Sequence, residues 1–287
     1  MVVFDTPVAT LDVIIPSVGR PTLARALESL ASGSELPDSV TVVSNEVPPD
    51  LASSGLPLRV LGFDSERYPY GVRDVALRRN VGIFASGCAH VLTFDDDQVA
   101  PRSMVADVRR LLEAEPVLWG HHRYVAMAGL GVAELLDRPP ARGRAREHPP
   151  NGWHGWQSCY GGLFAARRDV VEAVGGFDLG FAGRHAGEDQ DLGRRLARRL
   201  TGRERVYIHE PPFAWHPTSR EPWPSTRTNV CPSGEHALVP EIVGGARGER
   251  CTRCPWFVTA TAPSNDRGDA PVIRFDPSLV AVSVFGS

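Results

Sequence analysis

The sequence contains no lysine: all 31 basic residues among its 287 are arginine, and 34 acidic residues give a net charge of -3. A chain without lysine cannot form a pyridoxal Schiff base, use a lysine nucleophile or build a Walker-type phosphate loop, because each needs an amine. Any phosphate must therefore be bound by arginine, backbone amides or a metal ion. A nucleic-acid-binding protein usually has a strongly basic face, which a net charge near neutral does not indicate. We therefore expect no nucleic-acid partner.

Long apolar runs are missing too, since none approaches the roughly 20 residues that a membrane span requires. The first residues, 1–5, show neither the basic nor the apolar region of a signal peptide. We therefore expect a cytoplasmic protein without a membrane span. Five cysteines are too few and too unevenly spread for a secreted disulfide framework, which leaves reduced thiols or a metal site.

What the chain does contain is the pattern of an α/β fold. Short β-rich runs alternate with helical patterns over the first two hundred residues, which predicts a mixed, mostly parallel sheet flanked by helices. The expected strands are 11–15, 40–43, 58–63, 90–94 and 156–165, the last interrupted by Gly161-Gly162. The expected helices begin near Pro21 and Pro101 and cover 72–85, 169–174 and 188–200.

Two segments depart from this alternation. Asp137 to Pro150 carries four prolines and four arginines without an apolar period, which predicts a mobile loop or lid. Beyond Trp215 the composition changes to Pro, Thr, Ser and Gly with paired cysteines. We place a boundary near Glu221, between a domain of residues 1–221 and a C-terminal extension of residues 222–287.

Three carboxylates, Asp95-Asp96-Asp97, directly follow the strand 90–94. Like charges in contact raise one another's pKa unless something positive neutralises them, and a divalent metal is the natural neutraliser. In an open α/β sheet the ligand crevice lies at such strand ends. Oxygen ligands of this kind suit Mg²⁺ or Mn²⁺ carrying phosphate oxygens. The alternative is a solvated turn that caps the next helix.

A second acidic cluster, Glu188-Asp189, begins the helix 188–200 after a glycine-rich approach. Simple N-terminal capping is one interpretation. The other is a carboxylate held in a cleft, suited to accept a proton from an attacking hydroxyl. Of the nine histidines, His209 and His216 follow this helix on β-like segments, and either could complete the coordination of a metal held by the aspartates.

The C-terminal extension carries a third set of candidate ligands. Cys231-x4-His236 is followed after fourteen residues by Cys251-x2-Cys254, a spacing that suits tetrahedral structural zinc. We therefore expect a small zinc knuckle or ribbon with its ligands within residues 231–254. The alternative is a set of unrelated thiols with a surface histidine.

Five motifs follow one another in order along the chain: Val13-Ile14-Ile15-Pro16-Ser17 with Arg20, Arg79-Asn80-Val81-Gly82, Leu92 to Asp97, Gly161-Gly162 with Gly175-Gly176-Phe177-Asp178, and Glu188-Asp189-Gln190-Asp191-Leu192. This series resembles a GT-A glycosyltransferase of the family 2 type, the inverting nucleotide-sugar transferases. The resemblance implies the GT-A fold, a Rossmann-like sheet flanked by helices, to which the zinc-binding module would be added.

The resemblance also implies roles for individual residues. Asp95 and Asp97 would form the DxD pair, with Asp97 in contact with Mn²⁺ or Mg²⁺ and Asp95 or Asp96 nearer to the ribose and sugar. His216 would be the third protein ligand of that metal. Asp189 would be the catalytic base, with Glu188 oriented towards the acceptor or the donor sugar.

The nucleotide-sugar contacts that the resemblance implies are Pro16, Ser17, Arg20, Asn45, Arg79, Asn80, Asp95, Asp96, Gly161 and Gly162. One position departs from the family pattern, because the second strand commonly ends in an acidic residue that reads the base, and here Asn45 stands there. Asparagine can still hydrogen-bond a uracil edge, so UDP is the expected nucleotide, with GDP and dTDP as alternatives.

We therefore predict an enzyme, a metal-dependent glycosyltransferase that moves a sugar from a nucleoside-diphosphate sugar to an acceptor hydroxyl that the sequence does not reveal. Inversion in one displacement, with Asp189 as base, is the expected mechanism. One alternative is a sugar nucleotidylyltransferase, although such enzymes normally place lysines on the phosphates. The other is a zinc-ribbon protein that binds a nucleotide sugar or a partner without catalysis.

Overall fold

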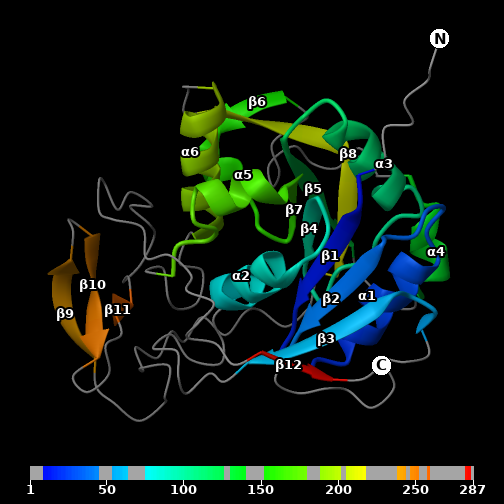
Figure 1. The fold of residues 1–287 in the computed structure, drawn as a ribbon, viewed down its shortest axis with the longest axis horizontal. Coiled ribbons are helices and arrows are strands. Elements are labelled where there is room, and N and C mark those ends of the chain that lie inside the picture. Colours follow the sequence, from blue (N-terminus) through cyan, green and yellow to red (C-terminus); the bar gives the residue numbers. More distant parts are fainter. Residues whose placement is uncertain are drawn as a thin grey trace.

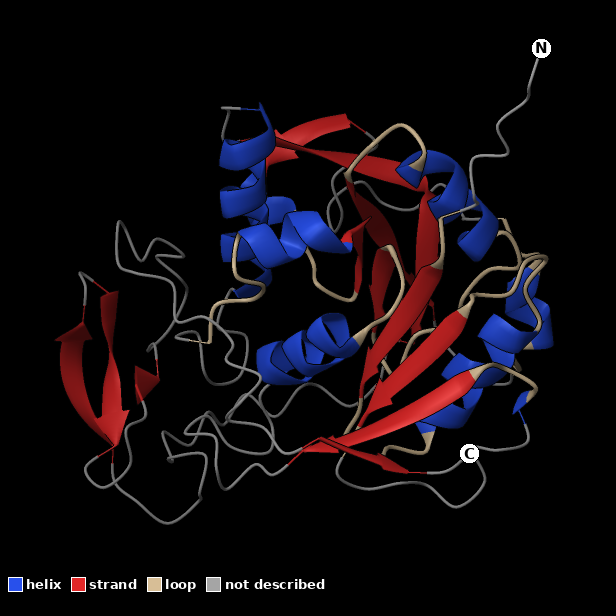
Figure 2. Cartoon of the chain, viewed as in Figure 1, coloured by secondary structure: helices blue, strands red, loops and turns tan. Residues whose placement is uncertain are grey.

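The fold is a central mixed sheet with helices on both faces (Figures 1 and 2). The computed structural model describes residues 9–44, 54–63, 75–125, 130–139, 152–179, 188–201, 205–217, 238–243, 246–251, 257–258 and 282–285. Within these ranges, each helix is too short or too polar to cross a bilayer.

The main sheet has nine strands among the described residues, in the order β12-β3-β2-β1-β4-β7-β5-β8-β6. Their bounds are β1 (Leu11–Pro16), β2 (Ser39–Val43), β3 (Leu58–Phe63), β4 (His90–Phe94), β5 (Val117–Val125), β6 (Gly152–Gly155), β7 (Leu163–Arg167), β8 (Arg205–Pro217) and β12 (Val282–Phe285). Strands β3, β2, β1, β4, β5 and β8 run in one direction, whereas β12, β7 and β6 run in the other. A separate antiparallel sheet joins β9 (Leu238–Val243), β10 (Ala246–Cys251) and β11 (Phe257–Val258).

The helices divide between the two faces of the main sheet. Their bounds are α1 (Thr22–Ala31), α2 (Val75–Ala85), α3 (Met104–Leu112), α4 (Ala133–Leu136), α5 (Arg168–Ala173) and α6 (Glu188–Thr201). Apolar side chains of α1 and α3 pack in one cluster with the sheet, and those of α2, α5 and α6 pack in another. Helix α4 belongs to a third cluster with the C-terminal half of β8.

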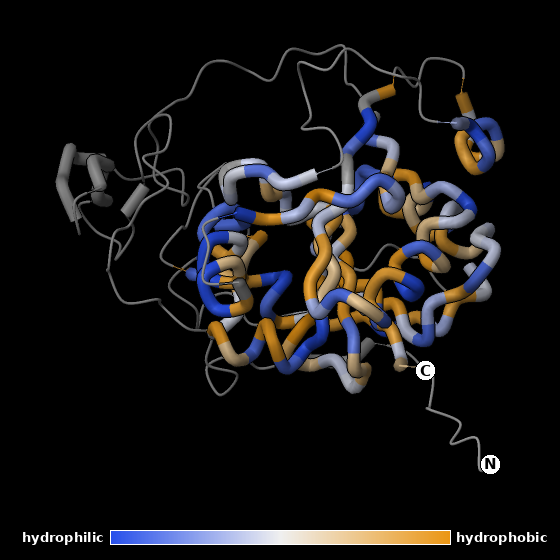
Figure 3. The backbone as a smooth tube through the Cα atoms, turned by 90° about the horizontal axis from the view of Figure 1, so that it is seen from above, coloured by the Kyte–Doolittle hydropathy of each residue, from blue (hydrophilic) through white to orange (hydrophobic). Residues whose placement is uncertain are grey.

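The local sequence explains why β1 lies at the centre of this arrangement. All six of its residues are buried, as expected of a strand covered on both faces, and its one charged residue, Asp12, accepts hydrogen bonds from the hydroxyls of Thr41 and Ser86. Helix α1 buries Leu23, Leu27 and Leu30, whose helical spacing places them on one side. Figure 3 shows the same segregation, with hydrophobic segments through the middle of the described fold.

The structure confirms the mixed α/β class and the first four predicted strands, but it corrects one predicted strand. Residues 156–165 do not form one strand, because a 3-10 helix at Trp156–Ser158 and a turn precede β7. Strands β5 and β6 were not predicted. The β-like segments around His209 and His216 are parts of one strand, β8. In α6, Leu192 and Leu196 are buried, whereas Leu200, at the same helical spacing, is 40% exposed.

Most of the predicted loop and the predicted boundary lie outside the described residues. Only 137–139 of the loop are described, without helix or strand, and residues 218–237 around Glu221 are not described. The division at residue 221 therefore stays a prediction. One described strand of the extension, β12, pairs antiparallel with β3 and is an outermost strand of the main sheet.

Candidate functional site

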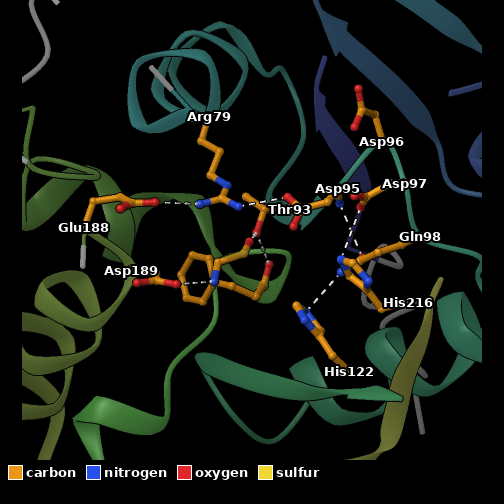
Figure 4. Close-up of polar contacts among 12 residues, drawn as sticks. Arg79, Thr93, Asp95, Asp96, Asp97, Gln98, His122, Glu188, Asp189 and His216 are labelled. Carbon is orange, nitrogen blue, oxygen red and sulfur yellow. Dashed lines mark hydrogen bonds and ion pairs between the residues drawn. The ribbon is translucent and has the colours of Figure 1, made fainter. Parts of the chain in front are cut away.

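The candidate site lies at the carboxyl ends of β1, β4 and β8, which point to the same edge of the sheet. Ser17 follows β1, Asp95 follows β4, and His216 lies at the end of β8. Strand β7 runs antiparallel to β4, so Gly162, which precedes β7, comes to the same edge. Helix α6 begins beside it with Glu188 (Figure 4). Residues that are far apart in the sequence therefore meet at one place.

Asp95 faces the guanidinium of Arg79. Its Oδ1 lies 2.8 Å from Arg79 Nη2, and its side chain is 27% exposed. Burial opposes ionisation of this carboxyl, but the charge and hydrogen bond of Arg79, with His122 and His216 nearby, hold its pKa below the ordinary value. Asp95 is thus an ionised carboxylate with a fixed cationic partner.

Asp96 and Asp97 have other partners, and Figure 4 shows Asp97 beside His216, with Asp96 pointing away from Asp95 and Asp97. Asp96 accepts a hydrogen bond of 2.7 Å from the Ser17 hydroxyl, and Asp97 Oδ1 lies 3.5 Å from His216 Nε2. Arg20 Nη1 lies 3.5 Å from both carboxylates. Burial nevertheless raises the pKa of each, and the charges of neighbouring carboxylates raise it further. This part of the edge is short of positive charge.

Arg79, on α2, joins the strand end to the start of α6. Its Nη1 lies 3.3 Å from Glu188 Oε1 while its Nη2 bonds Asp95. Only 5% of its side chain is exposed, and burial opposes its charge, but Asp95, Glu188 and Asp189 together raise its pKa. The planar guanidinium can serve two carboxylates at once, which a single ammonium could not do in this geometry.

Asp189, the second residue of α6, is held by backbone amides. The Gly161 N–H donates to its Oδ2 at 3.1 Å, and the Gln190 N–H donates to its Oδ1 at 2.8 Å. Burial raises the pKa of Asp189 above the ordinary value, although Arg79 and the two amides act in the opposite direction. A carboxylate of raised pKa at the edge of a site suits proton transfer better than one of ordinary pKa.

The two glycines before β7 allow close packing of the charged groups. A Cβ added at Gly161 would collide with the guanidinium of Arg79, and one at Gly162 would collide with the carboxylate of Asp95. The Thr93 hydroxyl donates to the Gly161 carbonyl and fixes the same turn. Glycine is therefore required here by the side chains of the protein itself.

Two further residues expected at the nucleotide, Asn80 and Pro16, form part of the supporting structure. Asn80 is fully buried, and its amide bonds both the N–H and the carbonyl of Phe177 at 2.8 Å. Pro16 ends β1 and pairs in register with Val43. Neither position presents an unused polar side-chain atom to the edge of the sheet.

Three residues around this edge were not predicted from the sequence: Gln98, His122 and Tyr160. Gln98 is fully buried; its Oε1 accepts the Asp95 N–H at 3.3 Å, and its Nε2 lies 3.0 Å from His122 Nε2. The His122 ring lies 6.1 Å from that of His216 and 5.7 Å from that of Tyr160. His122 lies on the unpredicted strand β5, so no local pattern pointed to it, whereas Gln98 directly follows the acidic triplet.

The ligands expected for the two metal sites are only partly brought together in the described residues. Within the described ranges, no three His, Cys, Asp or Glu side chains are grouped as they would be around one ion. Asn45, Cys231, His236 and Cys254 lie outside the described residues, and Cys251 is the last residue of β10. Strand β8 brings His216 to Asp97, whereas His209 lies seven positions earlier on that strand, nearer to α3 and its Arg110.

Comparisons with known proteins add the fold family. No family model matches the sequence, and no curated protein matches it. The structure is similar to S. aureus TarS 1–349 solved with UDP-GlcNAc, at 16% identity and a TM-score of 0.51, over 74% of this chain and 60% of that one. It is similar to the mannosyltransferase PcManGT from Pyrobaculum calidifontis, solved with GDP-Man and Mn²⁺, at 17% identity and a TM-score of 0.50, over 75% and 59%.

A third similar structure is GalNAc-T7 with UDP, GalNAc and Mn²⁺, at 12% identity and a TM-score of 0.57, over 77% of this chain and 46% of that one. The matched region spans less than two thirds of each of these proteins. Their shared architecture is the GT-A glycosyltransferase fold, which this chain also has.

Proposed function

We propose that this chain, which has the GT-A glycosyltransferase fold, transfers a sugar from a nucleoside-diphosphate sugar to an acceptor hydroxyl. The observation that carries the proposal is the meeting of two acidic groups at one sheet edge. The strand end with Asp95 and Asp97 and the helix start with Glu188 and Asp189 lie on opposite sides of Arg79. Such a pair of groups fits a reaction with a charged leaving group on one side and a proton acceptor on the other.

A divalent metal fits the donor side of this edge. Asp97 and His216 face each other with a carboxylate oxygen, which suits Mn²⁺ or Mg²⁺, and an imidazole nitrogen, which suits a transition metal such as Mn²⁺ better than Mg²⁺. The raised pKa values of Asp96 and Asp97 mean that additional positive charge would be favourable there. A bound metal would act as a Lewis acid on the leaving diphosphate. Ser17 and Arg20 would orient Asp96 and add charge-assisted contacts.

Asp189 is the group that we assign to the acceptor. Its two backbone amide contacts fix the direction of the carboxylate, and its raised pKa favours acceptance of a proton from the attacking hydroxyl. Attack by that hydroxyl from the side opposite to the leaving diphosphate would give inversion in a single step. Arg79, which contacts both Glu188 and Asp95, would restrain the two sides of the edge relative to each other.

The donor that we propose is a UDP-sugar. The similar TarS and GalNAc-T7 structures were solved with UDP-GlcNAc and with UDP and GalNAc, and PcManGT was solved with GDP-Man, so a GDP-sugar belongs in the same test. We further propose that the cysteines and histidine within residues 231–254 bind a structural zinc ion, on the strength of their spacing alone.

Turnover of a donor panel tests the function. With UDP- and GDP-sugars and Mn²⁺, we expect release of the nucleoside diphosphate, which a chelator stops and added Mn²⁺ restores. Asp97→Ala should lower this rate by about 10²–10³-fold. Asp169→Ala, on the exposed side of α5, is the matched control and should retain it. Binding of a donor without turnover by the wild type would indicate a binding protein and contradict the proposal.

A further inference from the structure

Arg195 lies one turn after Asp191 in α6. Its guanidinium bonds to Asp191 and to two backbone carbonyls in the segment that follows α5. Its Nε donates to Asp191 Oδ2 at 2.7 Å, its Nη1 to the Val174 carbonyl at 2.7 Å, and its Nη2 to the Gly176 carbonyl at 2.8 Å. Asp191 is itself buried, with 2% of its surface exposed. The bond to Asp191 holds the guanidinium within α6, and the two bonds to carbonyls connect α6 to the chain that leaves α5.

That chain is a tight turn whose backbone conformation needs glycine. Gly175 and Gly176 have φ angles of 85° and 70°, in the left-handed region. The turn leaves carbonyls at the end of α5 without helical partners, and a guanidinium is a suitable donor for them. The next residue, Phe177, is bonded through both its N–H and its carbonyl to Asn80 of α2.

These contacts form a closed path. Asn80, which bonds Phe177 after the glycine turn, is next to Arg79 in α2. Arg79 in turn contacts Glu188 in the first turn of α6. Asp191 and Arg195 follow on the same helix. The path therefore runs from α2 to the glycine turn, on to α6 and back to α2. In a closed path of this kind the first turn of α6 is restrained from both sides, by Arg79 at Glu188 and by Arg195 through Asp191.

We propose that Arg195 is a positioning residue for the reaction: through Asp191 and the glycine turn it holds the first turn of α6, and with it Asp189, in place against Gly161 in the turn before β7. The proposal rests on the proposed function. Arg195 does not contact the reacting groups. Loss of its guanidinium should therefore affect the acceptor step, while the donor side on β1, β4 and β8 keeps its own contacts.

Steady-state kinetics of Arg195→Ala and Arg195→Lys test this role. Misplacement of a catalytic group by about 1 Å can cost about 10²-fold in rate. We expect kcat to fall by about 10–10²-fold while KM for the donor changes little. Lysine should not rescue, because one ammonium cannot replace a three-way fork. Added guanidinium, compared with NaCl at equal ionic strength, should restore part of the kcat of Arg195→Ala.

The control is Arg199→Ala, an exposed position one turn further along α6, which should behave as the wild type. The proposal is overturned if Arg195→Ala keeps the wild-type kcat. It is also overturned if the variant weakens donor binding as much as it slows turnover. Thermal unfolding of each variant shows whether the fold is retained.

A second readout separates this proposal from the proposed function. The Gly161 N–H is bonded to Asp189, so its hydrogen exchange reports whether that carboxylate is in place. Exchange at Gly161 should accelerate in Arg195→Ala and stay at the wild-type rate in Arg199→Ala. Wild-type protein without turnover would contradict only the proposed function. Unchanged exchange at Gly161 in Arg195→Ala would contradict the positioning role.

Discussion

At the scale of single residues, three adjacent carboxylates face three different partners, although burial and the negative charges of their neighbours still raise the pKa of Asp96 and of Asp97. Asp95 faces Arg79, Asp96 faces the hydroxyl of Ser17, and Asp97 faces His216. The sequence predicts that this acidic triplet needs positive charge nearby. The guanidinium groups of Arg79 and Arg20 supply part of that charge. Only Asp95 has its pKa lowered as a result, which leaves the other two dependent on a further cation.

The raised pKa of Asp189 predicts the acid limit of the activity. A base works only when it is ionised, so kcat/KM should fall as the pH decreases through the pKa of Asp189. Because burial raises that pKa, the limit should lie above the ordinary value of 3.8. A pH profile measured under saturating metal tests this expectation.

Asp189→Asn is the matching variant, since it keeps the shape and removes the ionisation. It should lose about 10²–10⁴-fold in rate, the range expected for a general base, and with it the acid limb assigned to Asp189. An acid limb at or below pH 3.8 in the wild type would remove Asp189 from this role. So would near-wild-type turnover by the variant with its fold intact.

At the scale of elements, α6 combines a catalytic start with a tightly packed body. Gly193 faces Cys159 and Trp119, and a Cβ at this position would collide with the Cys159 sulfur. Gly193→Ala should gain about 1 kcal/mol in helix propensity but lose about 1–3 kcal/mol through overpacking. We therefore expect net destabilisation, measured as a lower free energy of unfolding in denaturant.

The partner variant Cys159→Ala tests the cause. It removes the sulfur and leaves a Cβ 3.0 Å from the added methyl group, a contact that a small shift can relieve. The cost of Gly193→Ala should therefore be smaller in the Cys159→Ala background than in the wild type. Stabilisation by Gly193→Ala alone would show that the helix can move to make room.

How well an element could be predicted depended on whether its own residues specify it. Strands β1 to β4 are short apolar runs between turn residues, and their predicted bounds agree with the structure within one residue. Strand β5 reads VLWGHHRYV and was not predicted, whereas β8 was predicted only as two β-like segments, because Glu-Pro-Pro lies between them. These segments are strands because neighbouring strands pair with them, which a local pattern cannot report.

The same reasoning applies to the site. The motif residues could be identified because their types and order carry information, as for Asp95 to Asp97 and Glu188-Asp189. Their partners could not, because Arg79 reaches Glu188 across 109 positions and His122 reaches the edge from an unpredicted strand. The sequence therefore indicated the chemistry of the groups, and the structure added which of them restrain one another.

At the scale of the whole molecule, a strand from the C-terminal extension joins the main sheet. Strand β12 covers β3 over four residue pairs, from Val282 opposite Phe63 to Phe285 opposite Val60. An uncovered β3 would present an open edge with unpaired backbone groups. A chain that ends at residue 281 should therefore unfold at a lower temperature, by about 2–4 °C for each kcal/mol lost, and aggregate more readily.

A chain that ends at residue 221 is the comparison, since it removes the cysteine segment as well. Equal losses in the two truncated chains would assign the effect to β12. A larger loss in the shorter chain, together with zinc in elemental analysis of the full chain alone, would assign part of it to the predicted zinc module. An unchanged unfolding temperature in the chain that ends at 281 would contradict a stabilising role for β12.

The contacts of Arg79 also set an order of assembly during synthesis. Its partner Asp95 is 16 positions away and is made soon after it, whereas Glu188 is 109 positions away. Because chains emerge from the ribosome N-terminal end first, Arg79 and Asp95 are both made well before α6, and the guanidinium cannot have both of its carboxylate partners until residue 188 has been made. The carboxylates of the donor side are thus made before Asp189, whereas His216, which faces Asp97 on that side, is made after α6, so the donor side is complete only once β8 has been synthesised.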